Sequence, residues 1–280
     1  MISDPILSSL ENLFISPLEL CNLNCRYCYT KKTKNILTNE QILNFVDRYQ
    51  KVQPLKSIIF CGGEVFTLPN FFDLVNQLIA QNIFITIITN GTIDRLNEIK
   101  NPLNCQLIVS FDGPKQIHDY NRGSGNFAKS KQFVEHALAL NFPVDIFYLV
   151  TAKSYPFVKT FSLFNLPITY LTDRLGSLNS DQVLDIKKNY RTYPSKDFGC
   201  YQISLQSNGQ VSSCCETNLF IGKISDPISK IIDKYFDSLN PCQKCQHCSG
   251  CCDPQYLCGY SKELSQSSCQ NVIESFRETQ

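Results

Sequence analysis

The sequence predicts an α/β fold in which parallel strands alternate with helices that cover them. Short apolar runs, typical of buried strands, are separated by longer segments whose apolar residues recur at helical spacing. Six strand–helix units of this kind fit between residues 12 and 172. An open, partial (β/α)6 barrel and a doubly wound sheet would both give this pattern, so periodicity alone does not choose between them.

The individual elements are expected in the following order. Apolar runs predict strands over residues 13–18, 57–61, 83–88, 106–111, 144–150 and 168–171. Apolar stripes predict helices over residues 38–50, 71–79 and 133–138, and Thr38 with Gln41 forms a candidate capping box for the first. A polar helix is expected over residues 180–190, and Asp226 is expected to cap a later helix that begins at Pro227.

These elements predict a chain in four parts. The α/β part would cover residues 12–172 and a connector residues 173–199. A small cysteine-rich domain would follow over residues 200–270, with a tail over residues 271–280. The cysteine-rich part has little periodicity, so we expect its fold to depend on bound metal.

Fifteen cysteines among 280 residues are many for a chain with no recognisable signal peptide. We expect a cytoplasmic protein, in which disulfides do not persist, so metal ligation explains the cysteines better. Cys61 and Cys105 stand alone in or beside strand-like runs and are interpreted as small buried residues. The net charge of +1 gives no field that would attract nucleic acid, and no apolar run is long enough to cross a membrane.

Three cysteines near the N-terminus, Cys21, Cys25 and Cys28, have CxxxCxxC spacing. Three thiolates can hold three irons of a four-iron cluster and leave the fourth iron open, whereas an electron-transfer cluster normally takes four cysteines. Zinc sites usually follow a CxxC pattern instead. The spacing therefore favours a catalytic iron–sulfur cluster, with a zinc site or a disulfide as the alternatives.

This triplet resembles that of the radical S-adenosylmethionine (SAM) family. The resemblance implies a partial, TIM-like barrel and a [4Fe–4S] cluster whose open iron binds the amino and carboxylate groups of SAM. It also implies that one electron cleaves SAM to methionine and a 5'-deoxyadenosyl radical, which takes a hydrogen atom from the substrate. Tyr27 stands where the family favours an aromatic residue beside the adenine.

Gly62, Gly63 and Glu64 follow the second predicted strand. Two glycines let the backbone approach a ligand closely, and a carboxylate can accept hydrogen bonds from an ammonium group. The matching motif of the radical SAM family binds the amino group of SAM, and the resemblance implies this role here. Taken alone, the three residues are also typical of a turn with a solvated glutamate.

The fourth predicted strand ends in SFDGP, and a similar pattern continues through IHDYNRGSGNF. This stretch resembles the SxDG segment of radical SAM enzymes that carry a SPASM domain, a C-terminal, cysteine-rich iron–sulfur extension. The resemblance implies that Ser110 contacts the SAM ribose, that Arg122 pairs with the SAM carboxylate, and that Asn90 lies in a loop near SAM. Asp112 is a further candidate cofactor residue, although Asp112 and His118 have the alternative of bracing the loop through hydrogen bonds.

The C-terminal cysteines resemble the SPASM pattern, except that six residues, not three, separate Cys251 from Cys258. The resemblance implies two auxiliary [4Fe–4S] clusters. The distal cluster would be held by Cys242, Cys245, Cys251 and Cys269. The proximal cluster would be held by Cys200, Cys214 and Cys258, with a fourth ligand from Cys215, another spare cysteine or the substrate. A zinc-binding module is the alternative.

SPASM enzymes mostly act on peptides or proteins. The resemblance therefore predicts a maturase that cross-links a ribosomally made precursor peptide, or excises part of it as tyramine-excising spliceases do. Few residues precede the first strand, so we expect leader recognition by a separate small protein, and reduction by a flavodoxin or ferredoxin. The alternatives are a protein oxidase of the sulfatase-maturing type and a non-catalytic, zinc-binding scaffold.

Overall fold

The computed structural model describes residues 10–28, 30–172, 176–192, 202–213, 215 and 220–244, without the side chains of residues 236 and 238–244. The described residues fall into two compact units. The first lies within Met1–Pro17, Asn35–Ile58 and Pro194–Gln280, and the second within Leu18–Lys34 and Ile59–Tyr193. All residues predicted to bind SAM, and the N-terminal cysteine triplet, belong to the second unit.

The second unit is built on four parallel strands that neighbour one another in chain order. They are β3 (Phe84–Thr89), β4 (Cys105–Phe111), β5 (Val144–Val150) and β6 (Ile168–Thr172). Both β4 and β5 are buried over most of their length on both faces, as expected for a parallel sheet covered by helices. Parallel strands end at the same edge of a sheet, so the loops after β3 and β4 meet there.

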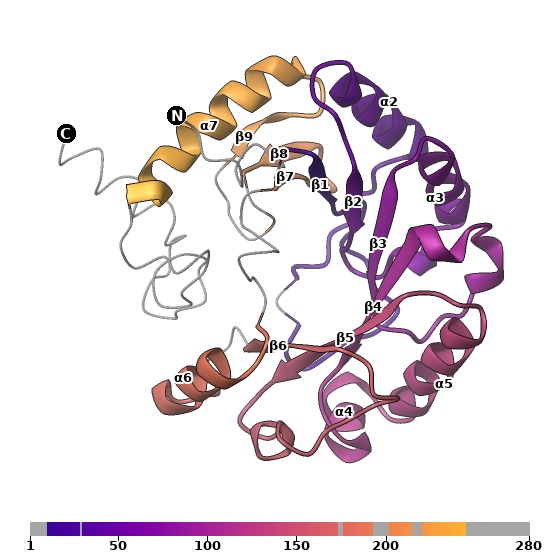
Figure 1. Ribbon diagram of the computed structural model, residues 1–280, viewed down its shortest axis with the longest axis vertical. Helices are drawn as coiled ribbons and strands as arrows, with labels where there is room; N and C mark the ends of the chain where they lie inside the picture. The colour runs from indigo at the N-terminus through magenta and orange to yellow at the C-terminus, as the bar shows by residue number, and fades with distance from the viewer. Residues whose placement is uncertain are drawn as a thin grey trace. The chain divides into compact units, whose positions relative to one another are not determined.

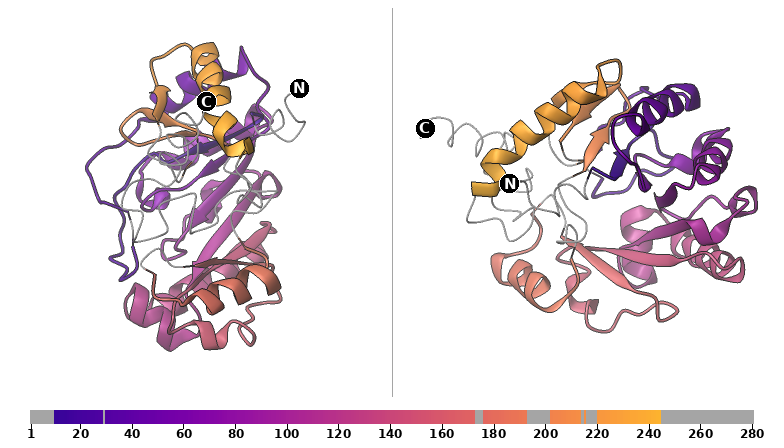
Figure 2. Two further views of the ribbon diagram at one scale, coloured as in Figure 1. Left: turned by 90° about the vertical axis from the view of Figure 1, so that its left-hand side faces the viewer. Right: turned by 45° about the horizontal axis from the view of Figure 1, so that its top comes forward.

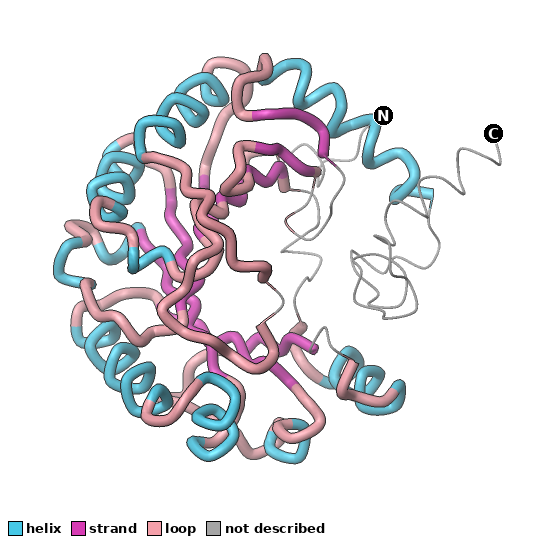
Figure 3. The backbone as a smooth tube through the Cα atoms, turned by 180° about the vertical axis from the view of Figure 1, so that it is seen from behind, coloured by secondary structure: helices cyan, strands magenta, loops and turns pink. Residues whose placement is uncertain are grey.

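Helices of the second unit lie on the outer side of these strands in Figure 1, and Figure 3 shows the same arrangement from behind. Helix α3 (Phe71–Ala80) packs on β3, and helix α5 (Asn126–Ala139) packs on β4 and β5. Helix α4 (Lys115–Arg122) packs on α5. This layer leaves the carboxyl ends of the strands to the loops that carry the predicted site.

Aromatic side chains fill the space between these helices and strands. Phe66 contacts Phe72 and Phe133 in perpendicular geometry, with ring centroids 5.0 Å and 5.6 Å apart. All three side chains are buried, and burial of one phenylalanine contributes about 1.5–3 kcal/mol. Phe66 lies two residues after Glu64, so the aromatic packing also fixes the segment that carries this carboxylate.

The first unit combines one parallel strand pair with a short antiparallel run. Its elements are β1 (Asn12–Ile15), α2 (Asn39–Gln50), β7 (Ile203–Leu205), β8 (Gln210–Ser212), β9 (Phe220–Lys223) and α7 (Ile228–Lys244). Strand β1 pairs in parallel with β7, and β7, β8 and β9 pair antiparallel in that order. Helix α7 packs on β9, and the two lie side by side in Figure 2. Strand β2 (Ser57–Phe60) spans the boundary between the two units.

Helix α2 begins at the predicted capping box. Thr38 Oγ1 accepts a hydrogen bond from the Gln41 N–H at 3.2 Å, and Gln41 Oε1 accepts one from the Thr38 N–H at 2.9 Å. Near the other end of the helix the buried Tyr49 hydroxyl donates to the Leu10 carbonyl at 2.8 Å. Both ends of α2 are therefore fixed within the first unit.

All six strands predicted from apolar runs are present, as is the predicted polar helix, α6 (Ser180–Asn189). Strands β7, β8 and β9 and helix α4 were not predicted. Three- and four-residue strands are too short to show alternation, and α4 buries few apolar side chains.

The predicted cap of α7 is wrong. The Asp226 carboxylate accepts from the Lys223 N–H at 3.0 Å, and the Pro227 carbonyl accepts from the Ile231 N–H at 3.2 Å. Pro227 therefore stands just before the helix, which begins at Ile228.

Replacing Thr38 by alanine is expected to lower the free energy of unfolding by about 1 kcal/mol, because the Gln41 N–H loses its acceptor. Urea unfolding monitored by circular dichroism measures the change. Thr38→Ser keeps the hydroxyl oxygen, so its free energy of unfolding should stay close to that of the wild type. Equal stability of the alanine and serine variants would contradict the cap.

Candidate functional site

The predicted cluster cysteines lie in the loop at the start of the second unit. Cys21 and Cys25 are half-buried, Cys28 is exposed, and all three are free thiols. Burial raises the pKa of the Cys21 thiol and of the Cys25 thiol, and the charge of Cys28 acts in the same direction on both. The three sulfurs are therefore near enough to influence one another electrostatically.

Three thiols are the donor set of a four-iron cluster in which one iron is left open. Among the described residues, no three Cys, His, Asp or Glu side chains converge as ligands of one ion. A four-iron cluster does not require such convergence, because each iron takes its own cysteine sulfur. The donor chemistry of Cys21, Cys25 and Cys28 thus fits the cluster that the sequence implies.

The backbone of Gly63 and Glu64 runs against the start of the cysteine loop. The Gly63 N–H donates to the Leu18 carbonyl at 2.9 Å, and the Glu64 N–H donates to the Leu20 carbonyl at 3.0 Å. A Cβ atom at Gly63 would lie 1.8 Å from the Leu20 carbonyl oxygen, so no side chain fits there. The glycine therefore permits a close approach of backbone to backbone, one residue before Cys21.

The Glu64 side chain is buried, with only 1% of its surface exposed. Its carboxylate accepts hydrogen bonds from Thr89 Oγ1 at 2.9 Å, from the Asn90 N–H at 2.8 Å and from the Phe66 N–H at 3.2 Å. Burial raises the pKa of Glu64, and these three bonds oppose that rise. The alternative of a solvated turn glutamate is therefore excluded. A carboxylate has about four acceptor positions, so one remains for a further donor.

An ion pair between a buried aspartate and a half-buried arginine joins the end of β4 to the end of α4. Arg122 Nε and Nη2 each lie 2.8 Å from Asp112 Oδ1, and the Asp112 side chain is 2% exposed. Burial raises the pKa of Asp112, and the Arg122 charge opposes that rise. The same guanidinium lowers the pKa of Cys25, so it lies close to the cysteine loop. Arg122 Nη1 has no hydrogen-bond partner in the described part of the chain.

The other predicted SAM residues also lie at strand ends or in the cysteine loop. Asn90 follows β3 and donates to the Asn22 side chain at 3.0 Å. Gly62 has a φ of 149°, a value that glycine adopts at no steric cost. Ser110 in β4 and Tyr27 are half-buried, and neither side chain has a hydrogen bond or ring contact with another described residue.

His118 is fully buried, and neither of its ring nitrogens has a hydrogen-bond partner among the described residues. Its ring lies 5.2 Å from that of Phe111 and 5.6 Å from that of Phe127. Burial lowers the pKa of His118 to about 3, and the Arg122 charge acts in the same direction. His118 is therefore a neutral packing residue, and the alternative in which it braces the loop through hydrogen bonds is wrong.

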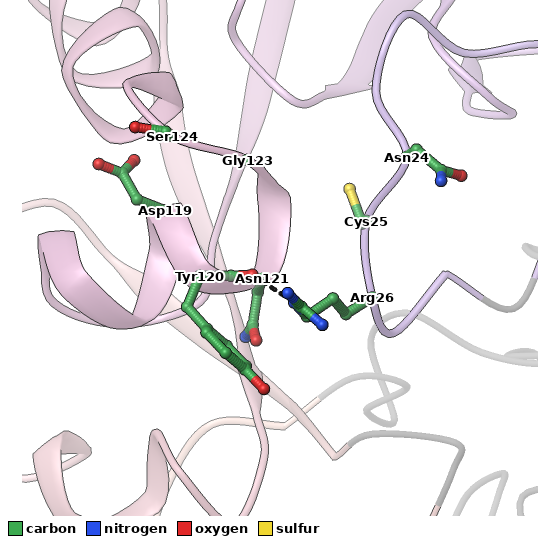
Figure 4. A pocket seen from close by; sticks show the side chains of 8 residues that line it. All are labelled: Asn24, Cys25, Arg26, Asp119, Tyr120, Asn121, Gly123 and Ser124. Atoms are coloured by element: carbon green, nitrogen blue, oxygen red, sulfur yellow. Dashed lines mark hydrogen bonds between the residues drawn. The ribbon is translucent and has the colours of Figure 1, made fainter.

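A pocket of about 620 Å³ opens between the cysteine loop and α4, and Figure 4 shows the Cys25 sulfur pointing into it. Its lining consists of Asn24, Cys25, Arg26, Asp119, Tyr120, Asn121, Gly123 and Ser124. The Arg26 N–H donates to the Asn121 carbonyl at 2.8 Å, and Arg26 Nε donates to the Tyr120 carbonyl at 2.9 Å. Backbone and side chain of Arg26 thus hold the loop against the helix.

Arg26, Tyr120 and Asn121 were not predicted as site residues. Arg26 lies 4.4 Å and Lys153 3.9 Å from the centroid of the Tyr120 ring, so two cations flank one aromatic side chain. The available signal for Asn121 was its spacing of three residues from His118, which places two polar residues on one face of a helix.

Most predicted ligands of the auxiliary clusters lie outside the described residues. These are Cys200, Cys214, Cys245, Cys251, Cys258 and Cys269. Cys242 lies in helix α7, but its side chain is outside the described part as well. The two auxiliary clusters therefore stay a prediction. The expectation of a buried Cys105 is confirmed, whereas Cys61 is only half-buried.

Residues 15–153 match the model of the radical SAM superfamily. The chain belongs to this superfamily, whose members use SAM and a [4Fe–4S] cluster. The AdoMet-dependent heme synthase of Methanosarcina barkeri is 30% identical over 155 residues, which are 51% of this chain and 44% of that protein.

Two further relatives are maturing enzymes. The serine-type anaerobic sulfatase-maturating enzyme of Bacteroides thetaiotaomicron is 30% identical over 135 residues, 40% of this chain and 33% of that protein. The mycofactocin maturase MftC of Mycobacterium ulcerans is 29% identical over 131 residues, 44% of this chain and 35% of that protein. The chain thus spans less than half the length of these curated relatives.

Solved structures extend the likeness over more of the chain. Native anSMEcpe with bound AdoMet matches 95% of this chain and 96% of that chain, with a TM-score of 0.68 and 21% identity. SuiB of Streptococcus suis bound to the precursor peptide SuiA matches 81% of this chain and 64% of that chain, with a TM-score of 0.64 and 14% identity. The predicted α/β fold with a partial barrel is confirmed. No helix in the described residues is long and apolar enough to span a membrane.

The burial of neutral His118 predicts a specific loss of stability in acid. The ordinary pKa of 6.5 lies above the folded value of about 3, so the unfolded chain binds the proton first as the pH falls. The contribution of neutral His118 is complete above pH 6.5 and is lost toward pH 3, by up to about 1.4 kcal/mol per pH unit.

Urea unfolding of the metal-free protein between about pH 8 and pH 4 tests this dependence. The free energy of unfolding of His118→Phe should fall less than that of the wild type as the pH decreases. Above pH 7 the difference between the two free energies should not depend on pH. Parallel curves over the whole range would contradict the account.

Proposed function

We propose that this chain is a radical SAM enzyme that modifies a ribosomally made precursor peptide. The observation that carries the proposal is the grouping of three cysteines, a buried carboxylate and a half-buried arginine around one loop. Glu64 is connected to that loop by the backbone bond to Leu20, and the Arg122 charge acts on Cys25. These are the residue types needed to hold a cluster and a zwitterionic cofactor beside it.

In this proposal Cys21, Cys25 and Cys28 hold the cluster, which when bound supplies the electron that cleaves SAM. Glu64 offers its remaining acceptor position to the SAM ammonium group. Arg122 offers Nη1 to the SAM carboxylate while Asp112 holds the other edge of the guanidinium. Fixing the two opposite charges of the methionine part at once sets the orientation of SAM relative to the cysteine loop.

The other predicted cofactor residues complete this arrangement. The side chains of Ser110 and Tyr27 have no hydrogen-bond partner among the described residues, so both are free to contact the ribose and the adenine. Gly62 and Gly63 bring the Glu64 backbone close to the cysteine loop. Cys200, Cys214 and Cys258, and Cys242, Cys245, Cys251 and Cys269, would hold two auxiliary clusters.

The peptide substrate is proposed by analogy with the relatives. SuiB is bound to a precursor peptide, and MftC is named as a maturase. The heme synthase among the relatives carries a similar domain, so likeness over this region does not by itself fix the substrate. We propose cross-linking or excision as the reaction, with a separate small recognition protein and a flavodoxin or ferredoxin as cytoplasmic partners.

A protein oxidase of the sulfatase-maturing type is the second candidate, favoured by the 30% identity to the sulfatase-maturating enzyme. Product analysis separates the two. An oxidase leaves a carbonyl group on one side chain, which a hydrazine labels. A cross-linked or excised peptide instead changes its fragmentation pattern in tandem mass spectrometry.

Replacing Cys21, Cys25 and Cys28 together by alanine should abolish the formation of 5'-deoxyadenosine from SAM. Iron content should fall by about four atoms per chain, the content of one cluster, while the remaining iron persists. Cys105→Ala is the matched control, because Cys105 is a buried thiol outside the site. Cleavage of SAM by the triple variant would refute the assignment.

Replacing Glu64 by glutamine should weaken SAM binding at least tenfold, because a hydrogen bond to a charged group contributes about 1.5–3 kcal/mol. Isothermal titration calorimetry of the anaerobically reconstituted protein measures the affinity, and iron content should not change. Asp94→Asn, at an exposed carboxylate that pairs with His136, is the control. Unchanged affinity in the Glu64 variant would exclude the proposed role.

A further inference from the structure

We propose that Asn90 is a positioning residue that holds the Cys21 end of the cysteine loop and hydrogen-bonds the Cys21 sulfur, and that it does not bind SAM. This inference rests on the proposed function, because it takes Cys21 as a ligand of the cluster. It revises the role that the family resemblance implies for Asn90, and it follows from the hydrogen bonds of this one side chain.

Every hydrogen-bonding position of the Asn90 side chain is already used. Nδ2 donates to Asn22 Oδ1 at 3.0 Å and to Cys21 Sγ at 3.8 Å. Oδ1 accepts from the Thr92 N–H at 2.9 Å and from Thr92 Oγ1 at 2.6 Å. An amide side chain has two N–H hydrogens and two acceptor lone pairs, so no position remains for a cofactor.

The orientation of the Asn90 amide is fixed by chemistry. Amide oxygen and nitrogen have nearly the same shape, so their placement must follow from the partners. The Thr92 backbone N–H can only donate, which requires the oxygen of Asn90 on that side. The NH2 group must then face Asn22 and Cys21, where it acts as a donor to the sulfur.

The main chain of Asn90 is held from two further directions. Its N–H donates to Glu64 Oε2 at 2.8 Å, and its carbonyl accepts from Ser130 Oγ of helix α5 at 2.7 Å. Only 7% of Asn90 is exposed. Two hydrogen bonds therefore hold the backbone that carries the Asn90 side chain beside the cysteine loop.

Residues of the cysteine loop also form hydrogen bonds back to the end of β3. Asn22 Nδ2 donates to Thr92 Oγ1 at 2.9 Å, which closes a ring of three side chains formed by Asn22, Asn90 and Thr92. Cys21 Sγ also accepts from the Leu23 N–H at 3.3 Å. The Cys21 sulfur thus has two N–H donors, one from its own loop and one from the end of β3.

Donors to a ligating sulfur affect the redox behaviour of a cluster. Reduction adds negative charge to the cluster and its sulfurs, and N–H groups stabilise that charge, so hydrogen bonds raise the reduction potential. Loss of the Asn90 donor should make the cluster harder to reduce, even though the Leu23 N–H remains. A residue with a purely structural role would not shift the potential in this way.

The test is the midpoint potential of the SAM-responsive cluster, measured by redox titration with electron paramagnetic resonance on the full-length, reconstituted protein. Asn90→Ala should lower the ratio of reduced to oxidised cluster about tenfold at a fixed potential, which is a shift of about 59 mV for one electron. Thr92→Val keeps the Asn90 donor to Cys21, so its midpoint potential should stay near that of the wild type. Asn76→Ala, which removes an asparagine bonded to the Glu98 carbonyl and the Lys100 N–H, is the matched control.

A second variant covers the case in which Asn90→Ala fails to assemble a cluster. Asn90→Asp keeps the acceptor for Thr92, removes the donor to Cys21 and adds negative charge, so the potential should again fall. An unchanged potential in the variant that assembles, or an equal shift in Thr92→Val, would overturn the inference.

The SAM affinity of the variants shows whether a failed prediction concerns the role of Asn90 or the proposed function of the whole site. Asn90→Ala should bind SAM nearly as well as the wild type, whereas a large loss of affinity with an unchanged potential would make Asn90 a SAM ligand. A wild-type protein whose clusters do not respond to SAM would overturn the proposed function and this inference together.

Discussion

The buried carboxylate of Glu64 is the constraint on which the site of the second unit depends. Burying a carboxylate costs several kcal/mol unless donors offset that cost. Thr89, Asn90 and Phe66 supply those donors, and two of them stand at the end of β3. The charge therefore fixes the segment after β2 against the end of β3, and it leaves one acceptor position for a further donor.

Two connections run from this carboxylate to the cysteine loop. The Glu64 N–H bonds the Leu20 carbonyl, and Asn90 bonds Asn22 and the Cys21 sulfur. The Arg122 guanidinium, held by Asp112, acts on the same loop near Cys25. An anionic group, Glu64, and a cationic group, Arg122, thus both act on this loop. Their charges are opposite to those of the ammonium and carboxylate groups of an amino acid.

Local features of the chain were predictable and long-range ones were not. The strands and the Thr38 capping box depend on residues close together in sequence, and both are present. The burial of Glu64 depends on partners 25 and 26 residues away, so the motif taken alone favoured a turn with a solvated glutamate. Helix α4, with its pocket-lining Tyr120, escaped prediction because it buries polar His118 and Asn121 instead of an apolar stripe.

The most direct test of the account is the metal content of the wild-type protein, reconstituted without oxygen, together with the 5'-deoxyadenosine that it forms from SAM under a reductant. We expect iron and sulfide in equal amounts, about 12 irons per chain if both auxiliary clusters assemble, and 5'-deoxyadenosine in the same sample. Zinc in place of iron, with no cleavage of SAM, would contradict this expectation and favour a zinc-binding scaffold.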